Sequence, residues 1–256
     1  MDKTNPGIFF LLGIPILNIT MAEALDLLFS SLTDQKETKE IHFVNAHCIN
    51  VAAKQNDYLA ILKNAEAIFP DGTGIRKAGE ALKNPIIDNV NGTDMFPLLC
   101  ERCAQEGKTI YLLGAGPSIA EKAAHWANAH AKKDIIAGFH DGFFSKDEEK
   151  GIVEAINASK ADILLLAMGV PRQELWIHAQ KNLLTVPVAM GVGGLFDFYS
   201  GSISRAPSWM RKTGIEWVWR LLMEPKRMWK RYIIGNAEFL LRINKIKRNR
   251  KKANNQ

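Results

Sequence analysis

Carboxylate, amide and glycine residues gather at the ends of several short apolar runs in this chain of 256 residues. Asp71 follows one such run and is itself followed by Gly72 and Gly74. A carboxylate at this point can act as a general base, with burial raising its pKa and the start of a helix lowering it. It can equally cap the next helix by accepting a backbone N–H from Thr73 or Gly74. The spacing alone leaves both interpretations open.

Asn45 stands at the end of the preceding apolar run. Its side chain offers a hydrogen-bond donor and an acceptor to a neutral polar ligand, and it can equally bridge two loops. The histidines do not indicate a metal site, because His42 and His47 are five residues apart and the chain holds no H-E-x-x-H pattern. We therefore predict a polar site without a metal.

Two glycine-rich turns could approach a phosphate. Gly114-Ala-Gly116 lies between a predicted strand and a predicted helix, where backbone N–H groups can meet a pyrophosphate. Ile119 takes the place of the third glycine of G-x-G-x-x-G, so a tight turn without a ligand explains these glycines nearly as well. Gly193 precedes Asp197 after the last predicted strand and suits a nucleotide diphosphate or ribose.

A further turn begins at Gly169 and runs through Pro171 to Gln173 and Glu174. Pro171 is preorganised for the start of a helix, and we expect Gln173 and Glu174 to face a cleft from its first turn. Single glycine-rich turns occur in many folds without ligands. Several such turns at successive strand ends together indicate a binding site.

The elements that must position these turns alternate along the chain. Apolar runs predict strands at residues 9–12, 41–44, 67–69, 109–113, 135–139, 163–168 and 186–190. Helical periodicity predicts helices at 21–32, with Thr20 as N-cap, and at 49–64, 93–105, 118–130, 146–158 and 172–181. This alternation predicts an α/β fold with a Rossmann-like parallel sheet, flanking helices, and ligands at the carboxyl ends of the strands.

After residue 204 the pattern changes to helices at 208–223 and 226–245, with tryptophans among Arg and Lys. Residues 205–256 carry 15 Lys+Arg against three acidic residues, a net charge of +12, whereas residues 1–204 carry −6. We therefore divide the chain into an α/β core, 1–204, whose two lobes meet near residue 107, and a basic helical appendage, 205–256. Such an appendage indicates an anionic partner: lipid, nucleic acid or substrate.

Composition excludes several classes of protein. With 47% hydrophobic and 23% charged residues, the chain is neither disordered nor of low complexity. No apolar run approaches the roughly 18–20 residues of a bilayer-spanning helix, and residues 8–17 lack the features of a signal peptide. Three cysteines cannot make a disulfide scaffold and suit a reducing cytosol. Cys100 and Cys103 are typical of small apolar residues one helical turn apart.

Taken together, these turns and their neighbours resemble the WecG/TagA/CpsF family of bacterial glycosyltransferases (glycosyltransferase family 26), from Gly13 to Asn236. The matching motifs are Asn45, Pro70-Asp71-Gly-x-Gly74, Asn91-Gly-Thr93-Asp94, Leu113-Gly114-Ala-Gly116, Gly138-Phe-His-Asp-Gly142-Phe-Phe, Gly169-x-Pro171-x-Gln173-Glu174, Gly193-x-x-Phe-Asp197, Arg205-Ala-Pro207-x-Trp209-Met and Gly214-x-Glu216-Trp-x-x-Arg220-Leu-x-x-Glu224-Pro225. No single motif is specific, but the set is.

The resemblance implies inverting transfer of a sugar from a UDP-sugar, often UDP-N-acetylmannosamine, to an undecaprenyl-diphosphate-linked sugar. It implies no essential metal and no cofactor. It places the general base on Asp71 and the family's polar pair on Gln173 and Glu174. The appendage would dock on the inner face of the plasma membrane, which is an anionic surface, and supply arginine to the active site. The matching arginines are Arg205, Arg211 and, as a catalytic residue, Arg220. The other expected substrate-binding residues are Asn45, Asn91, Thr93, Asp94, Gly114, Gly116, Gly169, Gly193 and Asp197.

Three positions depart from the family pattern and leave the donor sugar open, whether N-acetylmannosamine or a related hexose. Phe43 stands where many members have Thr, Asn89 where many have Arg, and Phe143 where Tyr is usual.

Two other classes of protein compete with the transferase. A Rossmann-type nucleotide-dependent oxidoreductase would rest on Gly114-Ala-Gly116. A nucleic-acid-binding protein would rest on the basic appendage, but its tryptophans fall at helical spacing and the core is acidic, so no nucleic acid is expected. The sequence leaves the oligomeric state open, and a homo-oligomer is compatible with it.

Overall fold

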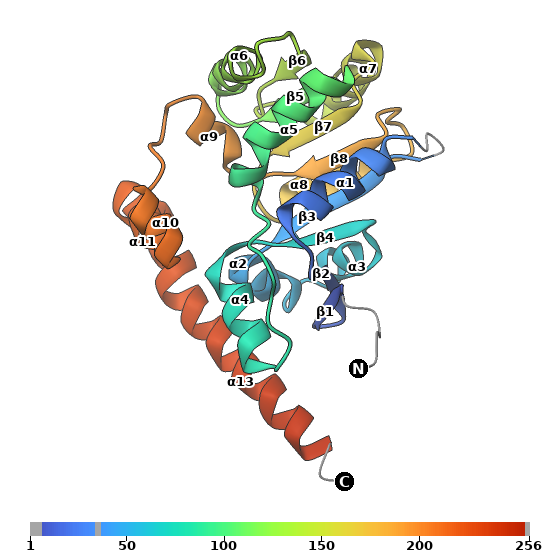
Figure 1. Ribbon diagram of the computed structural model, residues 1–256. Helices are drawn as coiled ribbons and strands as arrows, with labels where there is room; N and C mark the ends of the chain where they lie inside the picture. Colours follow the sequence, from blue (N-terminus) through green and yellow to red (C-terminus); the bar gives the residue numbers. More distant parts are fainter. Residues whose placement is uncertain (1–6, 34–36, 254–256) are drawn as a thin grey trace.

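The computed structural model describes residues 7–33 and 37–253. Six strands form one parallel sheet in the order β4-β3-β8-β7-β5-β6 (Figure 1). The strands are β3 (Lys39–Val44), β4 (Ala67–Pro70), β5 (Ile110–Gly114), β6 (Ile136–His140), β7 (Ile163–Ala167) and β8 (Val188–Gly191). The predicted α/β class with a parallel sheet is confirmed. Strands from both sides of residue 107 join this one sheet, and the division into two lobes stays a prediction.

Helices cover both faces of the sheet because successive residues of its central strands are apolar. Ile163 and Leu165 of β7 pack into one apolar cluster, whereas Leu164 and Leu166 pack into another. The first cluster lies under α1 (Met21–Ser31), α5 (Gly92–Glu106), α6 (Ile119–Ala131) and α9 (Leu195–Tyr199). The second lies under α7 (Glu149–Ser159) and α8 (Arg172–Gln180). A third cluster joins α2 (Ala46–Ala52), α3 (Asn56–Asn64) and α4 (Gly72–Ala81) to β3 and β4.

The N-terminal region forms a hairpin where the sequence predicted a single strand. β1 (Ile8–Leu11) pairs antiparallel with β2 (Ile14–Leu17). The chain turns between them at Leu12 and Gly13, whose φ angles are +56° and +78°. Pro15 concealed the second strand, because proline fits only an edge or a bulge of a sheet.

The predicted helix 49–64 is interrupted between Ala52 and Asn56. Both halves bury apolar side chains in the same cluster, Ile49 from α2 and Leu62 from α3, so the periodicity continues across the break. Thr20 caps α1 as predicted, in a capping box with Glu23.

The appendage contains α10 (Ser208–Thr213), α11 (Glu216–Met223), α12 (Pro225–Trp229), a π-helical turn η2 (Lys230–Ile234) and α13 (Gly235–Ala253). Gly214, at φ +74°, separates α10 from α11. The long α13 runs along α2 and α4 (Figure 1) and buries Phe239 and Ile243 in the third cluster. Residues 254–256 of the predicted appendage lie outside the described ranges. Within the described ranges, no helix combines the length and apolarity needed to cross a membrane.

Candidate active site

Asp71 directly follows β4 at the carboxyl edge of the sheet and precedes α4. Within the described chain its side chain makes no capping hydrogen bond to that helix. Its Oδ2 instead accepts a hydrogen bond from Asn45 Nδ2 at 3.0 Å. Burial raises the pKa of Asp71, whereas the Asn45 hydrogen bond and the charges of Arg231 and Arg220 act in the opposite direction. A partly buried carboxylate with a raised pKa is suited to taking a proton.

Asn45 connects the ends of β3 and β4 with the two ends of its amide. Its Oδ1 accepts from the backbone N–H of His47 at 3.0 Å and of Cys48 at 3.3 Å, which caps α2. Its Nδ2 is thereby turned toward Asp71. The loop-bridging interpretation of Asn45 is therefore confirmed, and the residue bridged is the candidate base.

Asn89 lies at the same carboxyl edge of the sheet, beside Gly72, which follows Asp71. Its Oδ1 accepts the backbone N–H of Gly72 at 2.6 Å, so this departure from the family pattern supplies a neutral acceptor beside Asp71.

The appendage brings Arg220 to the turn that follows β8. The Arg220 Nη2 lies 3.8 Å from Asp197 Oδ2, and its Nε donates to Glu224 Oε2 at 3.2 Å. Burial raises the pKa of Asp197, and Arg220 opposes this. A Cβ on Gly194 would come within 2.6 Å of Arg220 Nη2, so this glycine leaves room for the arginine.

Arg231 is a further candidate residue, which the sequence motifs did not single out. It lies in the π-helical turn η2, a geometry that often marks functional sites. Among the described residues its buried Nε has no hydrogen-bond partner, and its guanidinium lies 5.7 Å from the centre of the Tyr232 ring. Its charge acts on Asp71 and also on His47, whose pKa is lowered to about 4, chiefly by burial. No spacing rule could have found it from Arg220, because the helix breaks at Glu224 and Pro225 between the two arginines.

Asp94 pairs with the other two predicted arginines. Its Oδ1 accepts from Arg205 Nη2 at 2.8 Å and lies 3.7 Å from Arg211 Nη1. Its Oδ2 accepts from Asn91 Nδ2 at 2.7 Å, and Asn91 also caps α5. The Thr93 carbonyl accepts from the hydroxyl of Tyr199. These residues come together around α5, and their contact with substrate stays a prediction.

Gln173 and Glu174 do not face a cleft, contrary to expectation. They are 2% and 0% exposed, because α8 turns them under β8. Gln173 Oε1 accepts the backbone N–H of Gly193 at 2.9 Å, and its Nε2 donates to Glu174 Oε1 at 2.9 Å. Gln173 therefore holds the turn at Gly193 in place, and Glu174 in turn holds Gln173. Burial raises the pKa of Glu174.

The glycines near the site divide into two kinds. A Cβ on Gly114 would come within 2.6 Å of the Ala167 backbone, so close packing of β5 on β7 requires this glycine. Around Gly193, at φ +59°, and Gly169, at φ +77°, the described residues leave a Cβ position open. Gly193 and Gly169 therefore fit the close approach of a ligand, while Gly114 is explained by packing.

The turn at Gly116 borders a polar hollow of about 210 Å³ at the start of α6. Its lining residues are Ser118, Ala120, Glu121, Phe139, His140 and Asp141. β3, β8 and β7 stand between β4, which Asp71 follows, and β5, so the ends of these two strands are about 19 Å apart at the usual strand spacing. The predicted phosphate turn and the candidate base thus lie along one edge, but not in direct contact.

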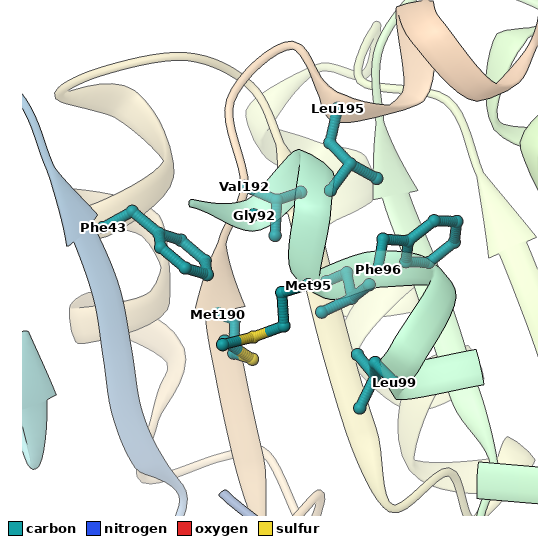
Figure 2. Close-up of a pocket in the computed structure, with 9 residues that line it drawn as sticks. Phe43, Gly92, Met95, Phe96, Leu99, Met190, Val192 and Leu195 are labelled. Atoms are coloured by element: carbon teal, nitrogen blue, oxygen red, sulfur yellow. The ribbon is translucent and has the colours of Figure 1, made fainter. Parts of the chain in front are cut away.

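Phe43 packs its ring beside Gly92, the first residue of α5. It lines an apolar cavity with Gly92, Met95 and Leu195 (Figure 2), whose volume of about 10 Å³ is that of roughly one water-sized probe. The Phe43 side chain, which departs from the family pattern, therefore packs in the apolar core.

Metal ligands and disulfides do not account for the remaining chemistry-bearing residues. In the described part of the chain, no three His, Cys, Asp or Glu side chains form a metal-binding group, and the absence of a metal requirement stays a prediction. Cys100 and Cys103 are free and fully buried on α5, which confirms their apolar interpretation.

Comparison with known proteins agrees with this geometry. The model of the "Glycosyl transferase WecG/TagA/CpsF family" matches residues 9–253. A Bacillus subtilis (strain 168) relative, named N-acetylglucosaminyldiphosphoundecaprenol N-acetyl-beta-D-mannosaminyltransferase, is 31% identical over 93% of this chain and 92% of its own. A Staphylococcus aureus (strain MW2) relative of the same name is 31% identical over 98% of both chains. Neither supports the oxidoreductase alternative, and the chain belongs to the WecG/TagA/CpsF family of glycosyltransferases.

Proposed function

We propose that this glycosyltransferase moves N-acetylmannosamine, or a related hexose, from a UDP-sugar to a lipid-diphosphate-linked sugar during cell-surface polysaccharide synthesis. The two relatives are named for transfer of N-acetylmannosamine to N-acetylglucosaminyl-diphosphoundecaprenol, and they match this chain over nearly its whole length. Asp71 receives a hydrogen bond from Asn45, and this bond is present despite the departures from the family pattern at Phe43 and Asn89.

The observation that carries this proposal is the environment of Asp71. Its carboxylate is bonded to Asn45 rather than to the helix it precedes, and its pKa is raised by burial. In the proposed step, the acceptor hydroxyl oxygen attacks the anomeric carbon while its proton passes to Asp71. The bond from that carbon to the diphosphate oxygen breaks, and UDP leaves with the electron pair. General base catalysis of this kind contributes about 10²–10⁴-fold.

Cationic side chains meet the charge that develops on the leaving diphosphate. Arg231 has a buried and unpartnered Nε within the described residues, and its charge acts directly on Asp71. Arg220 stands at the turn after β8, beside the open Gly193 position. Oriented N–H donors of this kind stabilise developing charge more than water does. The uridine end would then extend toward the hollow at the start of α6.

The appendage also offers a surface for a peripheral membrane contact on the inner face of the plasma membrane. It exposes large apolar side chains at Trp209, Leu222, Met223, Trp229, Ile233, Ile234, Leu240 and Leu241. Its net charge is +12 over residues 205–256. Tryptophan settles at the headgroup level while Arg and Lys attract anionic lipid. We expect deletion of residues 205–256 to abolish sedimentation with anionic vesicles; unchanged sedimentation would move the contact elsewhere.

The test is UDP release measured across a panel of UDP-sugars, with a short-chain lipid-diphosphate N-acetylglucosamine as acceptor. We expect fastest release with UDP-N-acetylmannosamine, dependence on the acceptor, a β-linked product, and no loss of activity in EDTA. Acceptor-independent release from every donor, or an α-linked product, would contradict the proposal.

A further inference from the structure

We propose that Asp94 is a positioning residue, which clasps Arg205 and Arg211 and thereby holds the start of the appendage against α5. The family resemblance predicts that all three side chains bind substrate. The clasp is defined by these three residues. Its effect on turnover rests on the proposed function, but the clasp itself is measurable without any substrate.

Both carboxylate oxygens of Asp94 are already occupied. Oδ1 accepts from Arg205 at 2.8 Å and lies 3.7 Å from Arg211, while Oδ2 accepts from Asn91 at 2.7 Å. The backbone N–H of Asp94 donates to Asn91 Oδ1 at 2.8 Å, which fixes the carboxylate on the first turn of α5. These bonds are charge-assisted and therefore stronger than neutral ones.

Asp94 is ionised at neutral pH. Burial alone would raise its pKa, but hydrogen bonds from Asn91 and Arg205 outweigh burial and lower the pKa below the ordinary value. Glu216 is the other carboxylate near Arg205, at 3.9 Å, and burial raises its pKa. Asp94 is therefore the principal anion that holds Arg205.

The clasp lies where the chain leaves the core. The Arg205 side chain is 23% exposed, and Ala206 and Met210, which lie between the two arginines, are buried. A second tie is made at Gly214, whose carbonyl accepts from Thr73 Oγ1 at 2.7 Å. Thr73 is two residues beyond Asp71, so this second tie lies close to the candidate base in the chain.

Holding this segment in place also positions the helices after it. The chain runs from Arg211 through Gly214 into α11, which carries Arg220, and on to Arg231. Both Arg220 and Arg231 act on Asp71. Release of the clasp would therefore loosen these groups without removing any of them, and the expected kinetic consequence is a fall in kcat.

The test is hydrogen exchange of the backbone amides of residues 205–223 in the full chain without substrate, combined with donor kinetics. The variants are Asp94→Asn, Arg205→Gln, their double mutant, and the control Asp26→Asn. The control breaks an ion pair of comparable geometry with Arg102, on the exposed surface of α1 and α5.

We expect each clasp variant to speed exchange in residues 205–223 on the order of tenfold while exchange in β7 is unchanged. The double mutant should add little to the larger single effect, since the Asp94–Arg205 contact is lost in both single variants. We also expect kcat to fall with the KM for the donor nearly unchanged, and the Asp26 variant to behave as wild type.

Wild-type exchange in both single variants would overturn the clasp. Additive effects in the double mutant would show that the two residues act separately. A raised donor KM at constant kcat and constant exchange would assign Asp94 to the sugar instead. If no UDP-sugar serves as donor, the proposed function fails, while the exchange measurement still decides the clasp.

Discussion

Replacing Asn45 separates the base chemistry of Asp71 from the capping of α2. Asn45→Ala removes both the hydrogen bond to Asp71 at 3.0 Å and the cap acceptor of α2. Asn45→Ser keeps a capping oxygen, because serine is a good N-cap residue, but its side chain is too short to reach Asp71. The two variants therefore share the loss at the base and differ at the helix.

The expected pH shift follows from the hydrogen bond to Asp71, and the expected loss of stability follows from the cap of α2. A hydrogen bond to a charged group contributes about 1.5–3 kcal/mol, and 1.36 kcal/mol corresponds to one pH unit. Asp71 is partly exposed, so water replaces some of the lost interaction and the lower end applies. Because this bond favours the ionised carboxylate, its loss should move the acidic limb of kcat/KM upward by about one pH unit. The lost cap should lower the free energy of unfolding by about 0.5–2 kcal/mol in the alanine variant only.

The assay is the pH profile of kcat/KM for UDP release, read beside thermal unfolding of the same three proteins. Both variants should share the displaced acidic limb, with activity recovered at higher pH. An acidic limb that stays at its wild-type position in the serine variant would refute Asp71 as the titrating base.

Three further outcomes are expected from the same structure. Arg231→Gln should lower kcat about 10²-fold, as loss of a donor to developing charge does, and an unchanged kcat would remove Arg231 from the site. Glu174→Gln should unfold at a higher temperature than wild type at pH 8, with a smaller difference at pH 5. The reason is that the raised pKa of buried Glu174 favours the folded state at low pH, and this contribution is lost as pH rises through the folded-state pKa. Gly114→Ala should destabilise the fold by at least about 1–3 kcal/mol in urea unfolding, because a Cβ there meets the Ala167 backbone; wild-type stability would contradict that packing.

Much of the fold was readable from local pattern. The apolar run at 163–168 predicted a strand buried on both faces, and β7 is one. The hairpin partner β2 was missed because Pro15 argues against a strand. The five-residue α9 was missed because it is too short to show a helical period.

The site was readable only in part. Asp71 and Asn45 could be predicted as neighbours because each follows a predicted strand, and parallel strands end at the same edge of a sheet. Spacing could not show that Asp94 holds Arg205, 111 residues away, since only the folded chain joins them. Gln173 and Glu174 were expected in a cleft because polar side chains in a first turn usually meet solvent, and here they support a neighbouring turn instead.

The most direct test of the proposed chemistry is single-turnover transfer by Asp71→Asn. The amide keeps the size of the carboxylate, and its oxygen can still accept the hydrogen bond from Asn45, but it cannot take a proton. We predict sugar transfer slower by at least about 10²-fold, with UDP-sugar binding retained. Transfer at the wild-type rate would contradict the assignment of Asp71 as the base.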